Sequence, residues 1–319
     1  MTGRSTGDSS SGICTTFGYC PVPCDIETSQ FSLQTLPCHA NSVNDVANDP
    51  NVINDWIYAG AQERRDIVSG EIRSMPYNVR IFALPKTHAL TLHKRRDPDE
   101  IDFAVWCLSF FIGMRLTTVE AGFLDATPIT PGKLIDFVLS RGTLADSIQV
   151  ALNYLESERS NPRAPKRVAA AIHALFLAQN PQNLPFEEFQ YLYMALDACF
   201  QLVASKETKM PPVPHSRRIQ WTCEKFGMPV PSWAEDTQAI HSPLSIVRND
   251  TFHEALFFGW PLGFSVYGGN GPSENQRNVI LQMQSLICRL LVAILVRPEV
   301  GYVHTPVDTR QRHGLELLY

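Results

Sequence analysis

The chain has 319 residues, of which 44% are hydrophobic and 18% are charged, and its formal charge at pH 7 is −5. This length suits two domains with hydrophobic cores of their own, because domains typically have roughly 100 to 200 residues. The composition excludes a disordered chain, a collagen-like repeat and a disulfide-stapled mini-protein. The acidic surplus also argues against a protein that coats nucleic acid without specificity, because such proteins carry a strong positive surplus.

Residues 1–45 are rich in Ser, Pro and Cys and show neither helical nor strand periodicity, so we expect an extended leader. Residues 1–11 are polar, and no apolar core of a secretory signal follows them. We therefore expect a cytoplasmic protein with reduced cysteines.

Two apolar stretches raise the question of a membrane span. Residues 103–114 are too few to cross a bilayer, and residues 279–296 are interrupted by Gln282, Gln284 and Arg289. Both stretches favour buried or amphipathic helices, and we expect no membrane partner.

Four of the eight cysteines fall in the leader. Zinc sites often take two ligands two to four residues apart, because one tight turn then offers two thiolates to one ion. Cys20 and Cys24 have this spacing, and Cys38 with His39 would complete the set. Neighbouring residues ligate one ion poorly and two prolines stiffen the loop, so we favour incidental thiols and expect no metal or cofactor. The other cysteines lie in apolar helical patterns and are expected in the core: Cys107, Cys199, Cys223 and Cys288.

Residues 46–130 predict a small N-terminal α+β domain. The segment from Tyr77 to Leu84 alternates as a strand does, and a second strand is expected from His88 to His93. An acidic segment then precedes a buried helix over Ile101 to Met114, as suits a helix N-terminus. Strand-like character returns from Leu116 to Ile129.

Residues 131–300 predict an all-α domain, and residues 301–319 predict a C-terminal tail. Apolar residues recur every three or four positions, as on one face of a helix. The expected helices span Leu144 to Glu156, Arg167 to Ala178, Phe186 to Ala204, Ser216 to Phe226 and Glu274 to Val296. The expected fold class is therefore α+β overall, a small α+β domain followed by a helical bundle.

The strongest candidate for chemistry is a short polar segment in the helical domain. Arg248 is followed by Asn249 and, after three more residues, by His253. Roughly 0.2 such arrangements of an arginine, a polar residue and a histidine are expected by chance in this composition.

Together with the helices expected before and after it, this segment resembles the HEPN family of helical ribonuclease-related domains, in particular its ApeA-like defence branch. The resemblance covers roughly residues 185–296 in helix order and is specific at the helix containing Phe189 to Phe200 and at the Arg-Asn-x3-His segment. It implies a four- to five-helix bundle that pairs into a homodimer. In active members of the family, the Arg-x4-6-His motifs of two protomers face each other and cleave RNA without a metal.

The resemblance assigns roles that suit the chemistry of these residues. A neutral imidazole such as that of His253 can take the proton of a 2′-hydroxyl or protonate the leaving 5′-oxygen. The Arg248 guanidinium would stabilise the charge of the phosphorane-like transition state. Asn249 would donate to the phosphate or orient the imidazole, and Asp197 would support the arginine. The expected products are a 2′,3′-cyclic phosphate and a 5′-hydroxyl.

The same residues also have a structural interpretation. Arg248 and His253 would then cap a helix and form salt bridges with Asp250 or Glu254 on the bundle surface. Glu254 stands directly after the histidine, where many nucleases of the family carry a small residue, and its carboxylate would repel phosphate. Many domains that resemble this family are inactive and serve as dimerisation or partner-binding modules.

The expected function is thus a metal-independent endoribonuclease, a nuclease of antiviral defence or of toxin type, with RNA as its substrate. Residues 46–130 would act as a sensor or regulator, and a regulatory or antitoxin protein would be a further partner; both follow from analogy alone. The alternative is a catalytically silent helical module of a defence or toxin–antitoxin complex. Basic residues expected to contribute weakly to RNA binding are Arg217, Arg218, Lys166 and Arg167.

Overall fold

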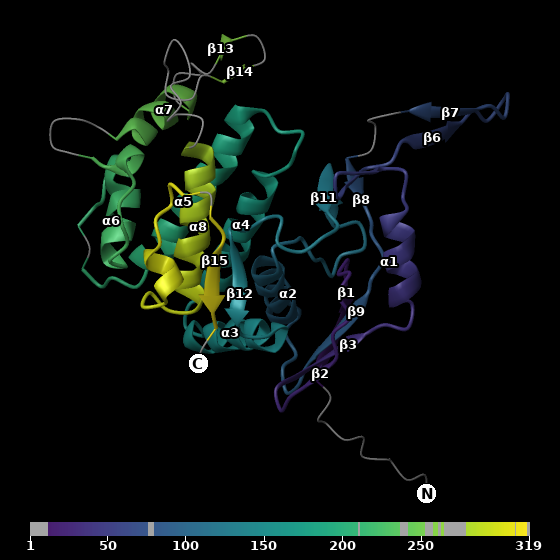
Figure 1. Ribbon diagram of the computed structural model, residues 1–319, viewed down its shortest axis with the longest axis horizontal. Helices are drawn as coiled ribbons and strands as arrows, with labels where there is room; N and C mark the ends of the chain where they lie inside the picture. Colours follow the sequence, from purple (N-terminus) through teal and green to yellow (C-terminus); the bar gives the residue numbers. More distant parts are fainter. Residues whose placement is uncertain are drawn as a thin grey trace, which may run out of the picture. The chain divides into compact units, whose positions relative to one another are not determined.

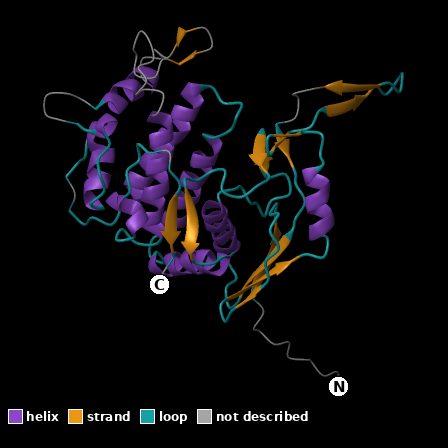
Figure 2. Ribbon diagram, in the orientation of Figure 1, coloured by secondary structure: helices purple, strands orange, loops and turns teal. Residues whose placement is uncertain are grey.

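The computed structural model describes residues 12–75, 80–209, 211–236, 242–252, 258–260, 263–264, 279–309 and 311–317. These residues form helices α1 to α8 and several small sheets (Figures 1 and 2), which confirms the mixed α+β class. The chain divides into two compact units. The first comprises Met1–Ser109 and Met114–Pro131, and the second comprises Phe110–Gly113 and Gly132–Tyr319. The main division after Pro131 lies next to the boundary expected at residue 130.

The first unit is built on a four-stranded antiparallel sheet. Cross-strand partners place apolar side chains together, because Phe31 lies opposite Leu92 and Leu33 lies opposite Leu90. All four side chains are buried, so one face of the sheet forms the core of this unit. The strands, in spatial order, are β1 (Ile13–Phe17), β9 (His88–Leu92), β3 (Phe31–Thr35) and β2 (Ile26–Glu27).

The expectation of an extended leader over residues 1–45 is wrong for residues 12–45. Three of the four strands of this sheet come from that segment, and helix α1 (His39–Ala47) begins in it. Phe17 and Tyr19 are fully buried. The strands escape detection because each is short, and because β1 and β3 are buried only by pairing with β9, which lies far along the chain.

The remaining elements of the first unit are short strands and one long helix. Helix α2 begins at Pro98, before the expected start at Ile101, and carries Asp99 and Glu100 in its first turn, where carboxylates stabilise a helix. Of the strand expected from Tyr77 to Leu84, the described part forms only β8, and residues 76–79 lie outside the described residues. The bounds are α2 (Pro98–Ile112), β4 (Val52–Ile53), β5 (Trp56–Tyr58), β6 (Gln62–Arg65), β7 (Ile72–Met75), β8 (Ile81–Phe82), β10 (Phe123–Leu124) and β11 (Ala126–Pro128).

Helices α3 to α8 make up most of the second unit. Thr143 caps α3 and exchanges hydrogen bonds with Asp146, which fixes the start of that helix. Helix α5 packs against both α4 and α8, and its apolar face is fully buried (Figure 1). The bounds are α3 (Leu144–Ser157), α4 (Arg163–Leu177), α5 (Pro185–Ala204), α6 (Arg218–Lys225), α7 (Pro243–Phe252) and α8 (Val279–Leu295), with 3-10 turns η1 (His215–Arg217), η2 (Ser232–Ala234) and η5 (Gly301–His304).

The second unit is not all-α, which corrects the expected bundle, and an all-helical HEPN bundle is not confirmed. Strand β12 (Phe137–Arg141) pairs in parallel with β15 (His313–Glu316), and β13 (Phe258–Trp260) pairs with β14 (Gly263–Phe264). Residues 301–309 and 311–317 are consequently part of this unit and not a free tail, since Tyr302 and Leu315 are buried. A parallel pair formed by segments so far apart in sequence has no local signature.

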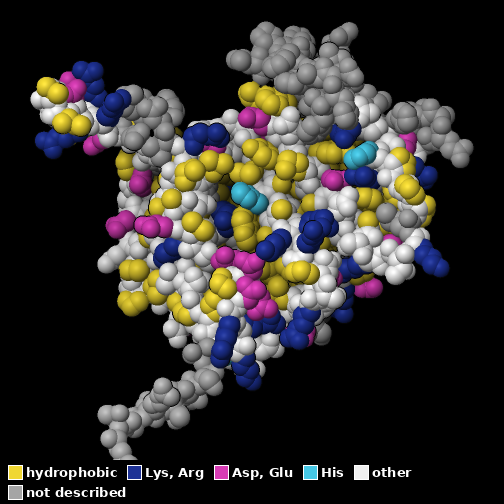
Figure 3. All heavy atoms as spheres, turned by 180° about the vertical axis from the view of Figure 1, so that it is seen from behind, with side chains coloured by type: hydrophobic (Ala, Val, Ile, Leu, Met, Phe, Trp, Pro, Cys, Tyr) yellow, Lys and Arg dark blue, Asp and Glu magenta, His cyan; other side chains and the backbone are white. Residues whose placement is uncertain are grey.

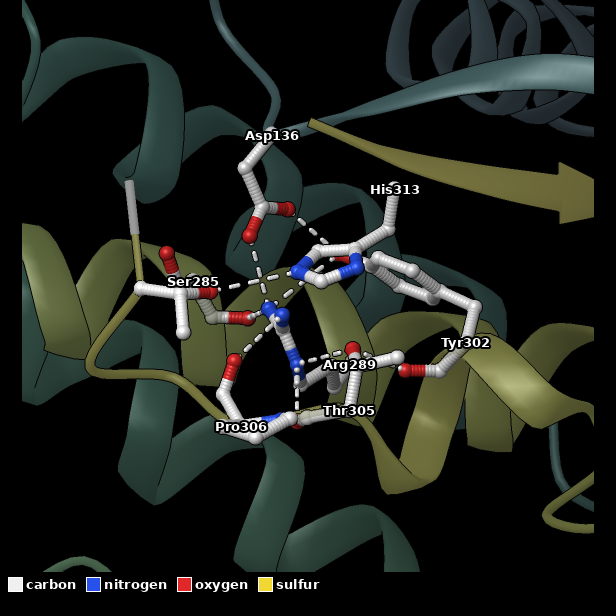
Figure 4. A network of polar contacts seen from close by, with 8 residues as sticks. Asp136, Ser285, Arg289, Tyr302, Thr305, Pro306 and His313 are labelled. Atoms are coloured by element: carbon white, nitrogen blue, oxygen red, sulfur yellow. Dashed lines mark hydrogen bonds and ion pairs between the residues drawn. The ribbon is translucent and has the colours of Figure 1, made fainter. Parts of the chain in front are cut away.

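Arg289 of α8 is the largest fully buried side chain, with 1% of its surface exposed. Its Nη1 donates to Asp136 Oδ2 at 2.7 Å and to the Ser285 carbonyl at 2.8 Å (Figure 4). Its Nε donates to the Thr305 carbonyl at 2.9 Å, and its Nη2 donates to the Pro306 carbonyl at 3.0 Å. The guanidinium can remain charged in the core because these acceptors replace its water.

Tyr302 of η5 completes the network. Its hydroxyl donates to Asp136 Oδ1, and its ring lies 4.8 Å from the Arg289 guanidinium. Burial raises the pKa of Tyr302 well above its usual range, so the phenol keeps its proton and remains a donor. The network thus ties α8, η5 and the residue before β12 together.

Replacing Asp136 with alanine should lower the free energy of unfolding by roughly 3 to 5 kcal/mol, because Arg289 would stay buried without its anion. Urea unfolding at pH 7 measures this loss. Glu299→Ala, at an exposed acid of the same unit, should change stability by less than about 0.5 kcal/mol. A loss of under 1 kcal/mol in Asp136→Ala would show that the pair does not support the core.

Two buried histidines lie side by side in the first unit. The rings of His39 and His88 are 5.3 Å apart and edge-on, and Phe17 stacks on His88 at 5.6 Å. The Nδ1 atom of His88 lies 3.0 Å from Thr87 Oγ1. Burial, and to a lesser degree the neighbouring His39, lowers the pKa of His88 to about 4, although a hydrogen bond with the Val22 backbone and the charge of Asp25 oppose this. His88 is therefore neutral in the folded protein near pH 7.

Acidification should destabilise the first unit through His88. The pKa is about 4 when folded and 6.5 when unfolded, so the unfolded chain binds the proton first. The contribution of neutral His88 to the free energy of unfolding is fully present above pH 6.5. It is lost as the pH drops through 4, by up to about 3 kcal/mol. Between pH 7 and 4, the free energy of unfolding should fall less for His88→Gln than for the wild type. An equal fall in both proteins would contradict the assignment to His88.

Candidate functional site

The structure places the arginine half of the Arg-Asn-x3-His segment on α7. Leu244 and Val247 are buried and fix one face of this helix against the unit. Arg248 is half-buried and Asn249 is exposed, and Arg248 Nη1 donates to Asn249 Oδ1 at 2.9 Å. His253 and Glu254 lie outside the described residues, and the side chain of Asp250 is not described.

Helix α5 presents a stripe of side chains toward α6 and α7. Phe189, Tyr193 and Asp197 follow one another at four-residue intervals and so share one face of the helix. The rings of Phe189 and Tyr193 stack with centroids 6.1 Å apart. Phe189 is fully buried and Tyr193 is half-buried, so the stripe runs from the core toward the surface.

Two arginines meet this stripe. The first, Arg218, begins α6; its Nη1 donates to Asp197 Oδ1 at 2.5 Å, and its guanidinium lies 4.8 Å from the Phe200 ring. The second, Arg248, shares a side-chain hydrogen bond with Tyr193. We call Tyr193, Asp197, Arg218, Arg248 and Asn249 the Tyr193 cluster.

The cluster carries a net positive charge, because two guanidiniums face one carboxylate. Burial is the largest cause that raises the pKa of Tyr193, and Asp197 adds to it, while both arginines oppose the rise. Tyr193 is consequently a neutral phenol at physiological pH. Half-buried guanidiniums held by aromatic and carboxylate partners suit the binding of a phosphate, which they can meet with two parallel hydrogen bonds.

The described hydrogen bond of Asp197 goes to Arg218 at the start of α6, and Tyr193 shares a side-chain hydrogen bond with Arg248. That Asp197 supports Arg248 stays a prediction. The role of Tyr193 was missed, although its spacing of four residues from Asp197 is a signal that the two share a face.

The other expected RNA-binding residues are spread over two elements. Arg217 is exposed at the end of η1, directly before Arg218, and Lys166 and Arg167 lie in the first turns of α4. On the face shown in Figure 3, basic side chains are interspersed with acidic ones and do not form one continuous field. This distribution agrees with the formal charge of −5 and favours contact with phosphate at a few fixed positions.

The cysteines of the first unit do not form a metal site among the described residues, where no group of three His, Cys, Asp or Glu side chains could hold an ion. The Cys20 thiol donates to the Val22 carbonyl, and the Cys38 thiol donates to the Lys86 carbonyl. Burial raises the pKa of Cys20 to about 11, so its thiol is neutral. The zinc alternative built on Cys20, Cys24, Cys38 and His39 therefore lacks a convergent ligand set. The four later cysteines are buried, as predicted.

The fold and the cluster define an α+β chain whose second unit carries a half-buried arginine site. No helix among the described residues is long and apolar enough to cross a membrane. The chain matches no protein-family model, no curated protein and no solved structure.

Replacing Arg218 with alanine should lower the free energy of unfolding by about 1 to 2 kcal/mol. The change removes the partner of Asp197 and the cation above Phe200. Arg217→Ala, which removes the same charge at an exposed neighbouring position, should cost less than about 0.5 kcal/mol. Equal losses measured by urea unfolding for the two variants would refute the structural role of Arg218.

Proposed function

We propose that the second unit is a metal-independent endoribonuclease of HEPN type that acts as a homodimer in a defence or toxin-like role. The observation that carries the proposal is the setting of Arg248. This residue begins the Arg-Asn-x3-His segment, is bonded to Tyr193, and shares that tyrosine's environment with a second guanidinium, Arg218. An arginine with only a structural role at the surface would need neither Arg218 as a second cation nearby nor the half-buried phenol of Tyr193.

In the proposed reaction, His253 removes the proton of a ribose 2′-hydroxyl. The 2′-oxygen then bonds to the adjacent phosphorus, the bond from phosphorus to the 5′-oxygen breaks, and a second histidine acting as acid protonates that oxygen. Arg248 stabilises the extra negative charge on the phosphorane-like transition state. The products are a 2′,3′-cyclic phosphate and a 5′-hydroxyl. The second histidine is supplied by the other protomer, which is why the proposal requires a dimer.

The contacts of Arg248 and Arg218 support different tasks. Arg248 lies on the same helix as the segment that leads to His253, so it suits the phosphate that reacts. Arg218 is held by Asp197 and Phe200, so its position is fixed before substrate binds and it suits a neighbouring phosphate. Tyr193 positions Arg248 and does not itself contact the reacting atoms.

A catalytically silent dimerisation or partner-binding module is the second candidate. The bond from Arg218 to Asp197 favours it, because that carboxylate already neutralises one of the two cations. The two candidates differ in whether Arg248 and His253 are needed for RNA cleavage or only for assembly.

Wild-type protein should cleave single-stranded RNA in the presence of EDTA and leave 2′,3′-cyclic phosphate ends. Arg248→Ala and His253→Ala should each reduce the rate by at least about 100-fold, because each removes a group that acts in the transition state. Arg159→Ala is the matched control, since this arginine is 72% exposed in the turn after α3 and the variant should cleave at the wild-type rate. The cleavage rate and the end groups are measured on end-labelled RNA.

The same samples are examined by analytical ultracentrifugation. If the wild type is dimeric but leaves RNA intact, the nuclease proposal is refuted and the silent module is favoured. Equal cleavage by the wild type and His253→Ala would place the activity outside the Arg-Asn-x3-His segment.

A further inference from the structure

A cavity of about 380 Å³ lies in the second unit, next to the buried Arg289 network. Asp136 and Ser285 belong to both, because they bond Arg289 and also line the cavity. Helix α8 forms one wall, and the segments before β12 and before β15 form others. This volume falls within the range of small-ligand sites in proteins, which is about 300 to 1,000 Å³.

The charges that line the cavity are compensated. Asp136 is paired with Arg289, and Lys133 has an interaction partner of its own. Arg312 and Asp308 are the other charged side chains of the described lining, one of each sign, and both are exposed. An ion that entered the cavity would leave water without meeting a surplus of the opposite charge. The lining therefore favours an uncharged ligand.

The wall formed by α8 carries uncharged polar groups that the protein does not use. Ser285 is only 8% exposed, yet its hydroxyl forms no hydrogen bond within the described part of the chain, and neither does the side chain of Gln284. The Oε1 of Gln282 accepts from Trp233 Nε1 at 2.8 Å, which leaves its NH2 group as a donor. Because Gln282 and Ser285 are three residues apart, they are neighbours on the surface of α8.

These groups disfavour a wholly apolar ligand. A ligand that removed water from them without replacing its hydrogen bonds would cost about 1 to 3 kcal/mol for each group. An amide donor next to a hydroxyl matches a pair of neighbouring hydroxyl groups on a ligand, because a hydroxyl both donates and accepts.

The apolar part of the lining is aliphatic. Leu134, Ile135 and Val307 contribute side chains from the other walls, and no aromatic residue occurs among the described residues that line the cavity. A planar base is usually bound by stacking on an aromatic or guanidinium plane. Aliphatic side chains instead suit the C–H faces of a saturated molecule, against which they pack without a preferred plane.

From these observations we infer that the cavity binds an uncharged, saturated ligand with neighbouring hydroxyl groups, which is the chemistry of sugars and polyols. Gln282 donates to one hydroxyl, Ser285 pairs with the next, and Gln284 offers a further amide. The aliphatic side chains cover the C–H face of the ligand. This site shares no residue with the Tyr193 cluster, so it stands whether or not the second unit cleaves RNA.

The probes are glucose, ribose, trehalose and myo-inositol, which share neighbouring hydroxyl groups on saturated rings. Two comparison ligands each change one property. Cyclohexanol has the ring of inositol with a single hydroxyl, and glucose 6-phosphate adds a charge to glucose. In saturation-transfer NMR with the full-length protein, at least one of the four probes should bind. In calorimetry it should bind at least tenfold more tightly than either comparison ligand.

Ser285→Ala and Gln284→Leu should each weaken binding of that probe at least tenfold, because each removes a group that pairs with the ligand and not with the protein. Ser205→Ala is the control, since it removes an exposed serine hydroxyl at the end of α5, outside the cavity. It should bind as the wild type does. Unfolding midpoints equal to that of the wild type show that each variant is folded.

Binding of none of the four probes would overturn the inference, and so would cyclohexanol that binds as tightly as myo-inositol. Probe binding that is unchanged in both Ser285→Ala and Gln284→Leu would place the ligand outside the cavity and refute the assignment. Tighter binding of glucose 6-phosphate than of glucose would assign the cavity to an anion.

Discussion

The second unit depends on the burial of one charge, the guanidinium of Arg289. Moving such an ion from water into a protein interior costs several kcal/mol unless hydrogen-bonding anions and carbonyls replace its hydration. Here the compensation comes from Asp136, from Tyr302 through Asp136, and from the carbonyls of Thr305 and Pro306. Because these partners belong to separate segments, satisfying the charge holds α8, the start of β12 and the C-terminal segment in one arrangement.

The same interaction explains where prediction from sequence succeeded and where it failed. Helices with a clear apolar repeat were predicted closely, since α3 begins at Leu144 and α5 ends at Ala204 as expected. The prediction that the stretch interrupted by Arg289 is a buried or amphipathic helix is confirmed by α8, but the burial of Arg289 itself was not predicted, and residues 301–319 were expected to be a tail. Both omissions have one reason: the acceptors that allow Arg289 to be buried come largely from segments that only tertiary structure brings together. The strands of the supposed leader were missed likewise, because β9 completes their sheet.

The candidate site shows the same limit at the level of single side chains. The spacing of Arg248 and Asn249 could be recognised in the sequence, and the structure places both on α7. The contact of Arg248 with Tyr193 could not be derived from the sequence, because it depends on how α7 is set against α5 along its axis. A displacement of one helical turn, about 5.4 Å, would bring a different residue of α5 to the arginine. A motif therefore predicts the type of chemistry more reliably than it predicts the residue that positions the arginine.

A cavity of about 380 Å³ lined by α8 and Asp136 lies on the same unit as the Tyr193 cluster, yet the geometry opposes strong coupling between the two through α8. Allosteric coupling requires an element with two arrangements whose balance both ligands change. Asp136 lines the cavity, but both of its oxygens are already engaged by Arg289 and Tyr302, and moving it would leave the guanidinium buried without its anion. Displacing Asp136 should therefore cost a free energy comparable to that of losing the Asp136–Arg289 pair. Any effect of a ligand in this cavity should therefore act through its exposed rim, where Asp308 and Arg312 can move without leaving a buried charge unpaired.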